Sequence, residues 1–456
     1  MQKLKELFEN HRILIAGFGR EGRSSYRTIR RLLPKQHIGI ADKNSALADD
    51  ETLKNDTNLT LHLGDDYLQD SAQYDLILKS PGIPTFDFEG ILPNTSTISS
   101  QTDIFLQLFG KQTVGITGTK GKSTTTNLIY SILKSASDNV LMAGNMGIPL
   151  FDILDNISKE TTVVIELSSH QLENAHTSPH IAILLNLFQE HLDHYHSFED
   201  YQLAKMNIAK YQTDKDVFIY CHDNELILQN IEKISPQGIL LPYSAGRLQK
   251  GCCPDGGWLT LQPSGTKVYD VSSERHLQGG HNLLNIMAAF LTAHCFGIAN
   301  EQTASVVNSF KGLEHRLEFV VQKNGITFYN DSISTIPEAC ISAVNALKTV
   351  DTLILGGFDR GIDYTVLARF LEQSDIHNIV FVGKAGERIA SLMNPDTLLK
   401  RNTIHSNNYS QIVEWCFAHT AIGKTCLLSP AASSYDQFKN FEERGRLFKS
   451  LVNKHQ

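Results

Sequence analysis

The stretch KQTVGITGTKGKSTTTNLIYSILK, residues 111–134, predicts a β-strand that ends in a glycine-rich loop and continues as a helix. Gly118 and Gly121 lie in the loop, and the triplet KST at residues 122–124 falls in the first turn of the helix. Glycines let backbone N–H groups approach a polyphosphate, the helix N-terminus adds a positive dipole, and the lysine adds a full charge. We therefore predict a phosphate-binding loop whose serine hydroxyl is placed to bind Mg²⁺.

This loop departs from the strict G-x-x-x-x-G-K-[ST] spacing, which needs a glycine where the chain has Ile116. The plain alternative is an ordinary glycine-rich turn before a core helix. We prefer the phosphate-binding interpretation because strand, loop and helix follow one another in the order that phosphate binding requires.

Length and composition set outer bounds on the fold and on the partners. A chain of 456 residues is too long for one ordinary core, so we expect about two to four domains. Hydrophobic residues make up 41% and charged residues 20%, as in soluble globular proteins. The net charge of −8 argues against a surface built for nucleic acid or anionic lipid. Anionic substrates would therefore be met by local cations and backbone amides.

The seven cysteines contain no C-x-x-C pair, and the adjacent Cys252 and Cys253 would form a disulfide only with strain. Neither a disulfide framework nor a cysteine zinc site is expected. No apolar run reaches the ~18 residues that a membrane span needs, and the N-terminal segment lacks the apolar core of a signal peptide. We expect a cytoplasmic, monomeric protein.

The segment GFGREG, residues 17–22, lies between a predicted strand at residues 12–16 and a predicted helix at residues 24–33. A second predicted strand, residues 37–41, ends in Asp42, where a Rossmann fold places the acid that binds a ribose. The region ends near Ser99, which leaves no room for a second mononucleotide-binding half. We favour a UDP-type ligand, while a dinucleotide or a purely structural turn stays open. SPGIP, residues 80–84, is a second candidate phosphate loop.

The polar segment PNTSTISSQTD, residues 93–103, is interpreted as a linker, after which a helix is expected at residues 102–109. Downstream, GNMG at residues 144–147 follows a predicted strand and is a candidate anion-binding turn. Another apolar strand, residues 163–165, places Glu166 at its carboxyl end, where ligands bind in open α/β sheets. This carboxylate suits Mg²⁺ on ATP, and a solvated strand end is the plain alternative.

Histidines occur at positions 170, 191, 194 and 196, but their H-x-x-H spacing lies in a loop and lacks the helical pairing and cysteines of a zinc site. We do not expect zinc. Lys205 falls on the following helix, and its spacing alone predicts a solvated side chain. A polar region, residues 212–280, contains further short strands, after which GGHNLLN at residues 279–285 opens a helix. Its two asparagines share a face and suit a purine edge, or Asn282 merely caps the helix.

Past residue 312 the strand and helix pattern restarts, so a third α/β region is expected. The predicted architecture is α/β with an N-terminal Rossmann-like domain at residues 1–99, a central P-loop ATPase-like domain with a mostly parallel sheet at residues 100–310, and a C-terminal Rossmann-like domain at residues 311–456.

These motifs together resemble the Mur ligase and folylpolyglutamate synthase superfamily. The resemblance covers nearly the whole chain and rests on segments that occur in the family's order: GITGTKGKSTTT, IELSSHQLE, EHLDHY, LAKMNIA, GGHNLLN, LEHRLE, YNDS and SPAASSYDQFKNFEERG. The N-terminal G-x-G-x-x-G region with SPGIP, and the last of these segments, resemble the branch that adds D-glutamate.

The resemblance implies ATP-dependent amide formation in cell-wall synthesis, with UDP-N-acetylmuramoyl-L-alanine and D-glutamate as substrates. A carboxylate attacks the γ-phosphate to form an acyl phosphate, and the amine of D-glutamate then displaces phosphate. Two Mg²⁺ ions are implied, and the family's lysine at the position of Lys205 is commonly carbamylated by CO₂, which turns a cation into an anionic ligand. Only a neutral amine accepts CO₂.

Roles follow residue by residue from the motifs and the resemblance. The implied catalytic residues are Lys122, His191 and Lys205. The implied metal ligands are Ser123 and Glu166 for the first Mg²⁺ and His191 and Lys205 for the second. The expected ATP contacts are Gly118, Thr119, Lys120, Gly121, Lys122, Ser123, Thr124, Asn282, Asn285, Arg316 and Asp331. The expected UDP-substrate contacts are Gly19, Arg20, Glu21, Asp42, Lys43, Ser80, Gly82, Asn145, Gln171 and His191. The implied D-glutamate contacts are Thr335, Arg360, Ser434 and Phe441. Because Arg316 and Asp331 belong to the third domain, the resemblance implies that domain closure completes the ATP site.

Two positions depart from the family pattern. Many relatives carry lysine after N-D-S, where this chain has Ile333, and Arg360 stands where a lysine often follows the L-G-G turn. Arginine keeps the charge but changes the reach and the hydrogen-bonding geometry. Alternatives that remain open are a sister ligase with another amino acid or a folate acceptor, a nucleotide-sensing module without catalysis, and a nicotinamide oxidoreductase.

Overall fold

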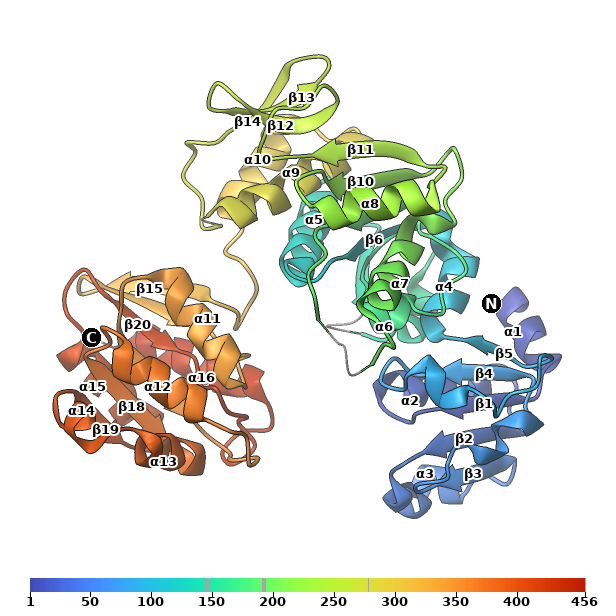
Figure 1. Cartoon of the computed structure of the whole chain (residues 1–456), viewed down its shortest axis with the longest axis horizontal. Helices are drawn as coiled ribbons and strands as arrows, with labels where there is room; N and C mark the ends of the chain where they lie inside the picture. Colours follow the sequence, from blue (N-terminus) through green and yellow to red (C-terminus); the bar gives the residue numbers. More distant parts are fainter. Residues whose placement is uncertain (145–147, 191–193, 278, 456) are drawn as a thin grey trace. The chain divides into compact units, whose positions relative to one another are not determined.

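The computed structural model describes residues 1–144, 148–190, 194–277 and 279–455. It contains three β-sheets of five, nine and six strands, each flanked by helices (Figure 1). The predicted α/β class is therefore confirmed. The chain forms two compact units, residues 1–310 and 311–456, and the first unit holds two of the three sheets. Each unit is described by itself below.

The first sheet is entirely parallel and has the order β3-β2-β1-β4-β5. Its strands are β1 (Ile13–Ala16), β2 (Ile38–Asp42), β3 (Leu59–Leu63), β4 (Leu76–Lys79) and β5 (Thr97–Ser99). Its helices are α1 (Gln2–Glu9), α2 (Arg20–Leu32) and α3 (Glu51–Lys54). The chain reverses across β1, and both candidate phosphate loops follow strands at this switch point, where α/β sheets bind ligands.

Side chains of β1 alternate between two apolar clusters, as the two-residue period of a strand requires. Ile13 and Ile15 belong to one cluster, and Leu14 and Ala16 belong to another. The first cluster also contains residues of the second sheet, such as Ile116. This shared apolar core explains why the first two sheets fold into one unit.

The prediction of a linker at residues 93–103 is wrong for the second half of that segment. Residues 97–99 pair with β4 as strand β5, and helix α4 (Gln101–Phe109) begins two residues later. The polar side chains that suggested a linker are buried, and they form hydrogen bonds with residues far away in the sequence. Gln101 donates to Ser25, and Asp103 accepts from the backbone N–H of His176 at 2.8 Å. Polar residues stabilise buried structure when each has such a partner.

The second sheet has the order β14-β13-β12-β11-β10-β9-β6-β8-β7, parallel from β7 to β12 and antiparallel in its last three strands. Its first strands are β6 (Thr113–Thr117), β7 (Val140–Gly144), β8 (Thr162–Glu166), β9 (Ile181–Leu184) and β10 (Val217–Cys221). The sheet ends with β11 (Ile239–Tyr243), β12 (Gly251–Asp255), β13 (Trp258–Gln262) and β14 (Thr266–Asp270). Strands β10 to β14 all lie in the polar region, residues 212–280, in which the sequence predicts further short strands.

Two groups of helices pack around this sheet (Figure 1). One group is α5 (Lys122–Ala136), α9 (Gly280–Cys295) and α10 (Asn300–Ser309). The other is α6 (Ser169–Leu172), α7 (Phe198–Lys210) and α8 (Glu225–Ile234). Both α5 and α7 contact β6, so the phosphate loop that leaves β6 lies between the first turn of one helix and the side chains of the other.

The third sheet has the order β15-β16-β20-β17-β18-β19 and is parallel except for the β15 hairpin. Its strands are β15 (Glu318–Lys323), β16 (Ile326–Asn330), β17 (Val350–Gly356), β18 (Asn378–Val382), β19 (Asn402–His405) and β20 (Thr425–Leu428). Its helices are α11 (Pro337–Leu347), α12 (Thr365–Gln373), α13 (Gly383–Leu392), α14 (Pro395–Leu399), α15 (Tyr409–His419) and α16 (Phe441–Lys454).

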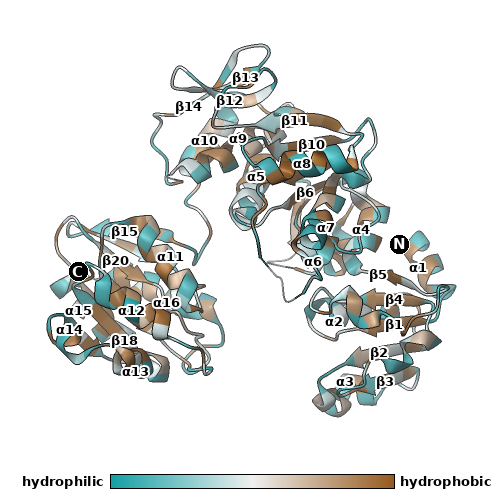
Figure 2. Ribbon diagram, in the orientation of Figure 1, coloured by the Kyte–Doolittle hydropathy of each residue, from teal (hydrophilic) through white to brown (hydrophobic). Residues whose placement is uncertain are grey.

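Alternation along the central strands again divides the core of this unit in two. Leu353 and Leu355 of β17 pack into one apolar cluster with α11, α12 and α13, whereas Ile354 packs into another with α15 and α16. In Figure 2 the hydrophobic residues, in brown, follow the strands, and the hydrophilic residues, in teal, lie on the outer faces of the helices. A sheet covered on both faces has near-continuous apolar strands, which is the pattern that the sequence shows here. Within the described residues, no helix combines the length and the apolarity needed to cross a bilayer.

Candidate active site

The phosphate loop has the predicted form, with β6 ending at Thr117 and α5 beginning at Lys122. Gly121 precedes the helix with φ +85°, a conformation that side chains with a Cβ rarely adopt. A Cβ at this position would also lie 2.9 Å from Oδ1 of Asn285. Glycine is therefore required both by the turn and by the close approach of α9.

Four residues outside the loop hold it in place, and no local pattern in the sequence indicates them. Asn186, just after β9, accepts from the backbone N–H of Lys120 at 2.8 Å and donates to its carbonyl at 3.0 Å. The Thr119 hydroxyl lies 2.8 Å from the buried Tyr201 hydroxyl on α7 and accepts from the backbone N–H of Phe188. Lys120 also pairs with Glu190. The loop is thus fixed before any ligand binds.

Lys122 folds back over the loop, and its ammonium donates to the carbonyls of Gly118 and Thr119, each at 2.9 Å. Ser123 and Thr124 follow in the first turn of α5, and Ser123 is buried. Glu166 ends β8, the neighbour of β6, and is also buried. A hydroxyl and a carboxylate at the same edge of the sheet are oxygen ligands of the kind that Mg²⁺ prefers.

Lys205 is almost completely buried, with 2% of its surface exposed, contrary to what its spacing on α7 predicts. Its ammonium donates to the carbonyl of Gly118 at 3.0 Å and lies 3.5 Å from the Thr117 hydroxyl. Burial, together with the charge of Lys122, lowers the pKa of the Lys205 amine well below its ordinary value. A buried lysine directly under a phosphate loop is placed for chemistry.

Asn282 and Asn285 lie on the first turns of α9, and the Asn285 amide donates to the Asn282 carbonyl oxygen at 3.2 Å. The helix is preceded by Gly279, so the alternative in which Asn282 caps the helix is wrong. Asn285 lines a cavity of about 480 Å³ that also contacts Lys120 and Gly121 of the loop. The cavity walls are mostly apolar, with Leu185, Phe188 and Leu284 among them. This space beside the phosphate loop suits a nucleobase.

A second cavity, of about 220 Å³, lies at the carboxyl edge of the first sheet. The predicted UDP-substrate residues Asp42, Lys43 and Gly82 line it, and so do Tyr67 and Asp87, which the sequence did not indicate. Asp42 accepts the backbone N–H groups of Phe18 at 2.6 Å and of Asn44 at 2.8 Å. The Ser80 hydroxyl donates to the carbonyl of Gly17 at 2.8 Å. These contacts join the two candidate phosphate loops around one cavity.

Gly19 immediately precedes helix α2, and Arg20 and Glu21 are its first two residues. Burial raises the pKa of Glu21, whose carboxylate accepts a hydrogen bond from the buried Gln171 of α6 at 2.7 Å. Residue 21 lies on a helix of the first sheet and residue 171 on a helix of the second, so the predicted substrate residues of the two regions meet within one unit.

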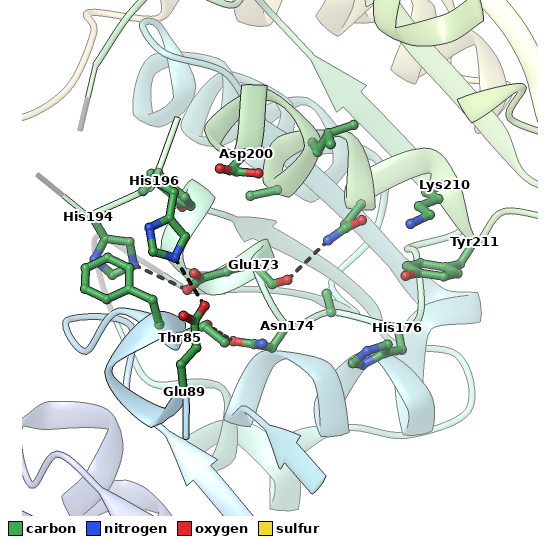
Figure 3. A pocket seen from close by; sticks show the side chains of 16 residues that line it. Thr85, Glu89, Glu173, Asn174, His176, His194, His196, Asp200, Lys210 and Tyr211 are labelled. Carbon is green, nitrogen blue, oxygen red and sulfur yellow. Dashed lines mark hydrogen bonds and ion pairs between the residues drawn. The ribbon is translucent and has the colours of Figure 1, made fainter. Parts of the chain in front are cut away.

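An ion-pair network reinforces the contact between the first two sheets. The buried Lys79 ammonium, at the end of β4, donates to Glu173 at 2.9 Å and to the carbonyl of Ile83 at 2.7 Å. His194 lies 3.3 Å from the same Glu173 oxygen. Figure 3 shows Glu173 and His194 beside a cavity of about 350 Å³, which His196 also lines. Lys79 thereby fixes the SPGIP loop against the region that follows β8.

Glu173→Gln is expected to lower the free energy of unfolding by about 3 kcal/mol at pH 7, because it leaves Lys79 buried without its carboxylate partner. Burial alone would raise the pKa of Glu173, but the hydrogen bond from His194 and the charge of Lys79 outweigh it and lower the pKa to about 2. The stabilisation is therefore complete above the ordinary glutamate pKa of about 4.3 and is lost as the pH falls toward 2.

Urea unfolding of wild type and Glu173→Gln at pH 7, 5 and 3 measures the difference in the free energy of unfolding. This difference is expected to be smaller at pH 3 than at pH 7. The matched control is Glu199→Gln, which removes an exposed ion pair with Lys233 of the same unit. Such a surface pair is expected to contribute less than about 1 kcal/mol. If Glu173→Gln and Glu199→Gln lowered the free energy of unfolding equally, burial would not be what makes the Lys79–Glu173 ion pair stabilising.

In the second unit, Arg316 is exposed on a loop between two residues with positive φ, His315 at +64° and Leu317 at +42°. Asp331 holds this loop, because its carboxylate accepts from the backbone N–H of Leu317 at 3.1 Å. The Ser429 hydroxyl donates to the other Asp331 oxygen at 2.7 Å. Burial raises the pKa of Asp331 to about 6. Their roles as ATP contacts stay predictions.

The four predicted D-glutamate residues lie in the same unit, at the carboxyl ends of its strands. Arg360 is exposed and donates to the carbonyl of Thr335 at 3.3 Å. Ser434 is buried in the loop after β20, and Phe441 begins α16. Ile333, which replaces the family's lysine, is half-buried.

Two predicted residues, Asn145 and His191, lie outside the described residues, as does most of the GNMG turn. Among the residues that the structure describes, no three His, Cys, Asp or Glu side chains converge on one point as a metal site requires. The Mg²⁺ ligands would instead be Ser123, Glu166 and the phosphates of ATP, and these oxygens fit a hard cation.

Taken together, the phosphate loop, the buried lysine beneath it and the cavity on the first sheet of the same unit indicate a nucleotide-dependent ligase. Residues 116–293 match the Mur ligase middle domain. A UDP-N-acetylmuramoylalanine--D-glutamate ligase of Clostridium botulinum is 31% identical over 99% of this chain and 98% of its own length, and that of Clostridium kluyveri is 35% identical over 87% and 86%.

Solved structures share the fold at lower identity. MurF from Acinetobacter baumannii gives a TM-score of 0.56 at 19% identity, covering 78% of this chain and 79% of that one. MurF from Thermotoga maritima, solved with ADP, gives 0.51 at 17% identity, covering 92% and 96%.

The chain belongs to the Mur ligase family, in the group of the UDP-N-acetylmuramoylalanine--D-glutamate ligases. It is accordingly an ATP-dependent ligase of peptidoglycan precursor synthesis.

Proposed function

We propose that the protein joins D-glutamate to UDP-N-acetylmuramoyl-L-alanine at the expense of ATP. The observation that carries this proposal is the burial of Lys205 against Gly118 of the phosphate loop, in the same unit as the cavity on the first sheet. The full-length relatives named for this reaction support it.

The chemistry proceeds in two displacements. A carboxylate oxygen of the UDP-linked acceptor attacks the γ-phosphorus of ATP, the bond to the bridging oxygen breaks, and ADP leaves. The amine of D-glutamate then attacks the acyl carbon, loses a proton, and phosphate departs with the electrons of the C–O bond. Both steps crowd anions together, so the site must supply positive charge and exclude water from the acyl phosphate.

Lys122 and the backbone amides of the loop supply that charge in our proposal, and Asn282 and Asn285 bind the adenine. Mg²⁺, when bound by Ser123 and Glu166, neutralises phosphate charge as a Lewis acid. Lys205 would have to carry an anionic group in order to hold a second Mg²⁺ together with His191. We propose that CO₂ supplies it: the amine forms an N–C bond with CO₂, one C=O electron pair moves to oxygen, and the nitrogen releases a proton. Depression of the Lys205 pKa supports this step, since only the neutral amine reacts.

The two loops of the first sheet bind the UDP moiety in this proposal, through the cavity that contains Asp42, Lys43 and Gly82. Gln171, with Asn145 and His191, orients the muramoyl part, while Thr335, Arg360, Ser434 and Phe441 bind D-glutamate. Arginine is suited to the carboxylate of that amino acid. The seven free thiols agree with action in a reducing cytoplasm.

Purified protein with ATP, Mg²⁺ and UDP-N-acetylmuramoyl-L-alanine is expected to release phosphate only when D-glutamate is added. Phosphate release is measured with a panel of D-glutamate, L-glutamate, L-alanine and meso-diaminopimelate, and with UDP-N-acetylmuramate and a folate as alternative acceptors. Preference for another amino acid or acceptor would assign the chain to a sister activity. Tight NAD(H) binding without phosphate release would instead favour an oxidoreductase.

A further inference from the structure

Arg444 is the largest fully buried side chain of the protein's described residues, with 1% of its surface exposed. It lies on the first turn of α16, whose first residue is Phe441. Burying a guanidinium is costly, and its pKa is lowered here by desolvation. Such a group is retained where its hydrogen bonds hold surrounding structure in place.

The guanidinium binds two loops at once. Its Nε donates to the Ser332 hydroxyl at 2.9 Å, and Nη2 donates to the Ser332 carbonyl at 2.8 Å. Both Nη1 and Nη2 donate to the carbonyl of Ala432 at 3.2 Å, and Nη1 also reaches the carbonyl of Ser433 at 3.4 Å. Ser332 follows β16, and residues 432–433 follow β20, so Arg444 joins the carboxyl ends of two neighbouring strands.

Two further segments meet at the same point. The Ser332 hydroxyl donates to the carbonyl of Phe441 at 2.8 Å, which ties in the start of α16. The backbone N–H of Phe358, in the loop after β17, donates to the carbonyl of Ser433 at 2.9 Å. Gly357 has φ +141°, and a Cβ there would lie 2.4 Å from that carbonyl and 3.2 Å from Nη1 of Arg444. Glycine is therefore needed where this loop passes the guanidinium.

No carboxylate of the described part of the chain lies within ion-pairing distance of Arg444. Its donors are directed at neutral oxygens, and the carboxylate of Asp436 acts on its charge from beyond ion-pairing distance. A neighbouring anion would be stabilised by that charge, and the N-terminus of α16 adds a dipole of the same sign.

We propose that Arg444 is a positioning residue for the amino-acid substrate. It fixes the four segments that carry Thr335, Arg360, Ser434 and Phe441, and its charge favours an anionic amino acid there. This inference rests on the proposed function, because those four residues bind D-glutamate only in that proposal. Arg444 itself is buried and does not contact the substrate.

Arg444→Lys is expected to raise KM for D-glutamate by about tenfold, because lysine keeps the charge but lacks the planar fork that reaches four acceptors. KM for the UDP-linked acceptor is expected to change by no more than about twofold, since Arg444 contacts none of the residues predicted to bind that acceptor. Ser332→Ala is a milder change, because it removes only one acceptor of the guanidinium. It is expected to raise KM for D-glutamate by about threefold.

The matched control is Arg401→Lys. The Arg401 guanidinium also binds backbone carbonyls of this unit, those of Ile376, Leu371 and Ser374, but it lies at the amino ends of β18 and β19. Its loss is expected to lower the thermal midpoint without changing KM for D-glutamate. If Arg444→Lys and Ser332→Ala leave KM for D-glutamate unchanged, or raise KM for the UDP-linked acceptor by the same factor as a general loss of folding would, the inference fails. A wild-type protein that turns over D-glutamate separates this failure from failure of the proposed function.

Discussion

Lys122→Ala is expected to lower kcat/KM of the D-glutamate-dependent phosphate release by about 10³-fold. The lysine starts α5 and folds over the loop, with its ammonium 2.9 Å from two loop carbonyls. A cation in this position follows the phosphate charge as the γ-phosphoryl group moves to the acceptor, so its removal acts mainly on the transition state. We therefore expect kcat to fall more than KM for ATP rises. Steady-state kinetics with each substrate varied in turn measures both.

The matched control is Lys134→Ala, which removes a lysine of the same helix that is exposed and pairs with Asp138. Its activity is expected to stay within about twofold of wild type. The nucleotide-sensor alternative predicts no turnover in any of the three proteins. Equal activity of wild type and Lys122→Ala would contradict the catalytic role of the loop.

The phosphate loop was readable from the sequence because its determinants are local. Glycine, lysine and serine at fixed spacing between a strand and a helix specify a turn and its ligand within about ten residues. The apolar strands of the three sheets could be predicted for the same reason. A strand that is buried on both faces of its sheet has a continuous run of apolar residues in the sequence. Short strands in polar regions, such as β12 and β14, carry no such signal.

What the sequence could not show depends on residues that are far apart in the chain. Lys205 looks like a solvated helix residue until Thr117 and Gly118 close over it, and only the family resemblance indicated otherwise. Lys79 meets Glu173 across 94 positions, and Arg444 meets Ser332 across 112. The linker interpretation of residues 93–103 failed in the same way, because the partners that bury its polar groups lie elsewhere. Burial of a charged side chain is a property of tertiary structure, and spacing within one helix does not report it.

Lys205→Ala is expected to lose activity by about 10³-fold and to recover part of it when a short-chain carboxylic acid such as acetate or propionate is added. Alanine leaves a space under the phosphate loop where the lysine side chain was packed, beside the carbonyl of Gly118. If a carbamate is the working form of Lys205, the missing group is a carboxylate, and a small acid that diffuses into the space restores it. If the amine itself were the working group, carboxylic acids would have no effect and a primary amine would rescue instead.

Direct observation of the carbamate provides a second measurement that does not depend on turnover. Wild-type protein equilibrated with ¹³C-labelled bicarbonate is expected to give a slowly exchanging carbamate carbon signal in NMR spectra, which Lys205→Ala lacks. Lys210→Ala, which removes the exposed lysine at the end of the same helix, is the control and is expected to keep both the signal and the activity. The depressed pKa of Lys205 sets the direction of the pH dependence: the neutral amine needed for CO₂ addition is available at lower pH than for an ordinary lysine, and acidification should remove the signal. A carbon signal that is retained in Lys205→Ala, or rescue by amines alone, would contradict the carbamate and with it the second metal site.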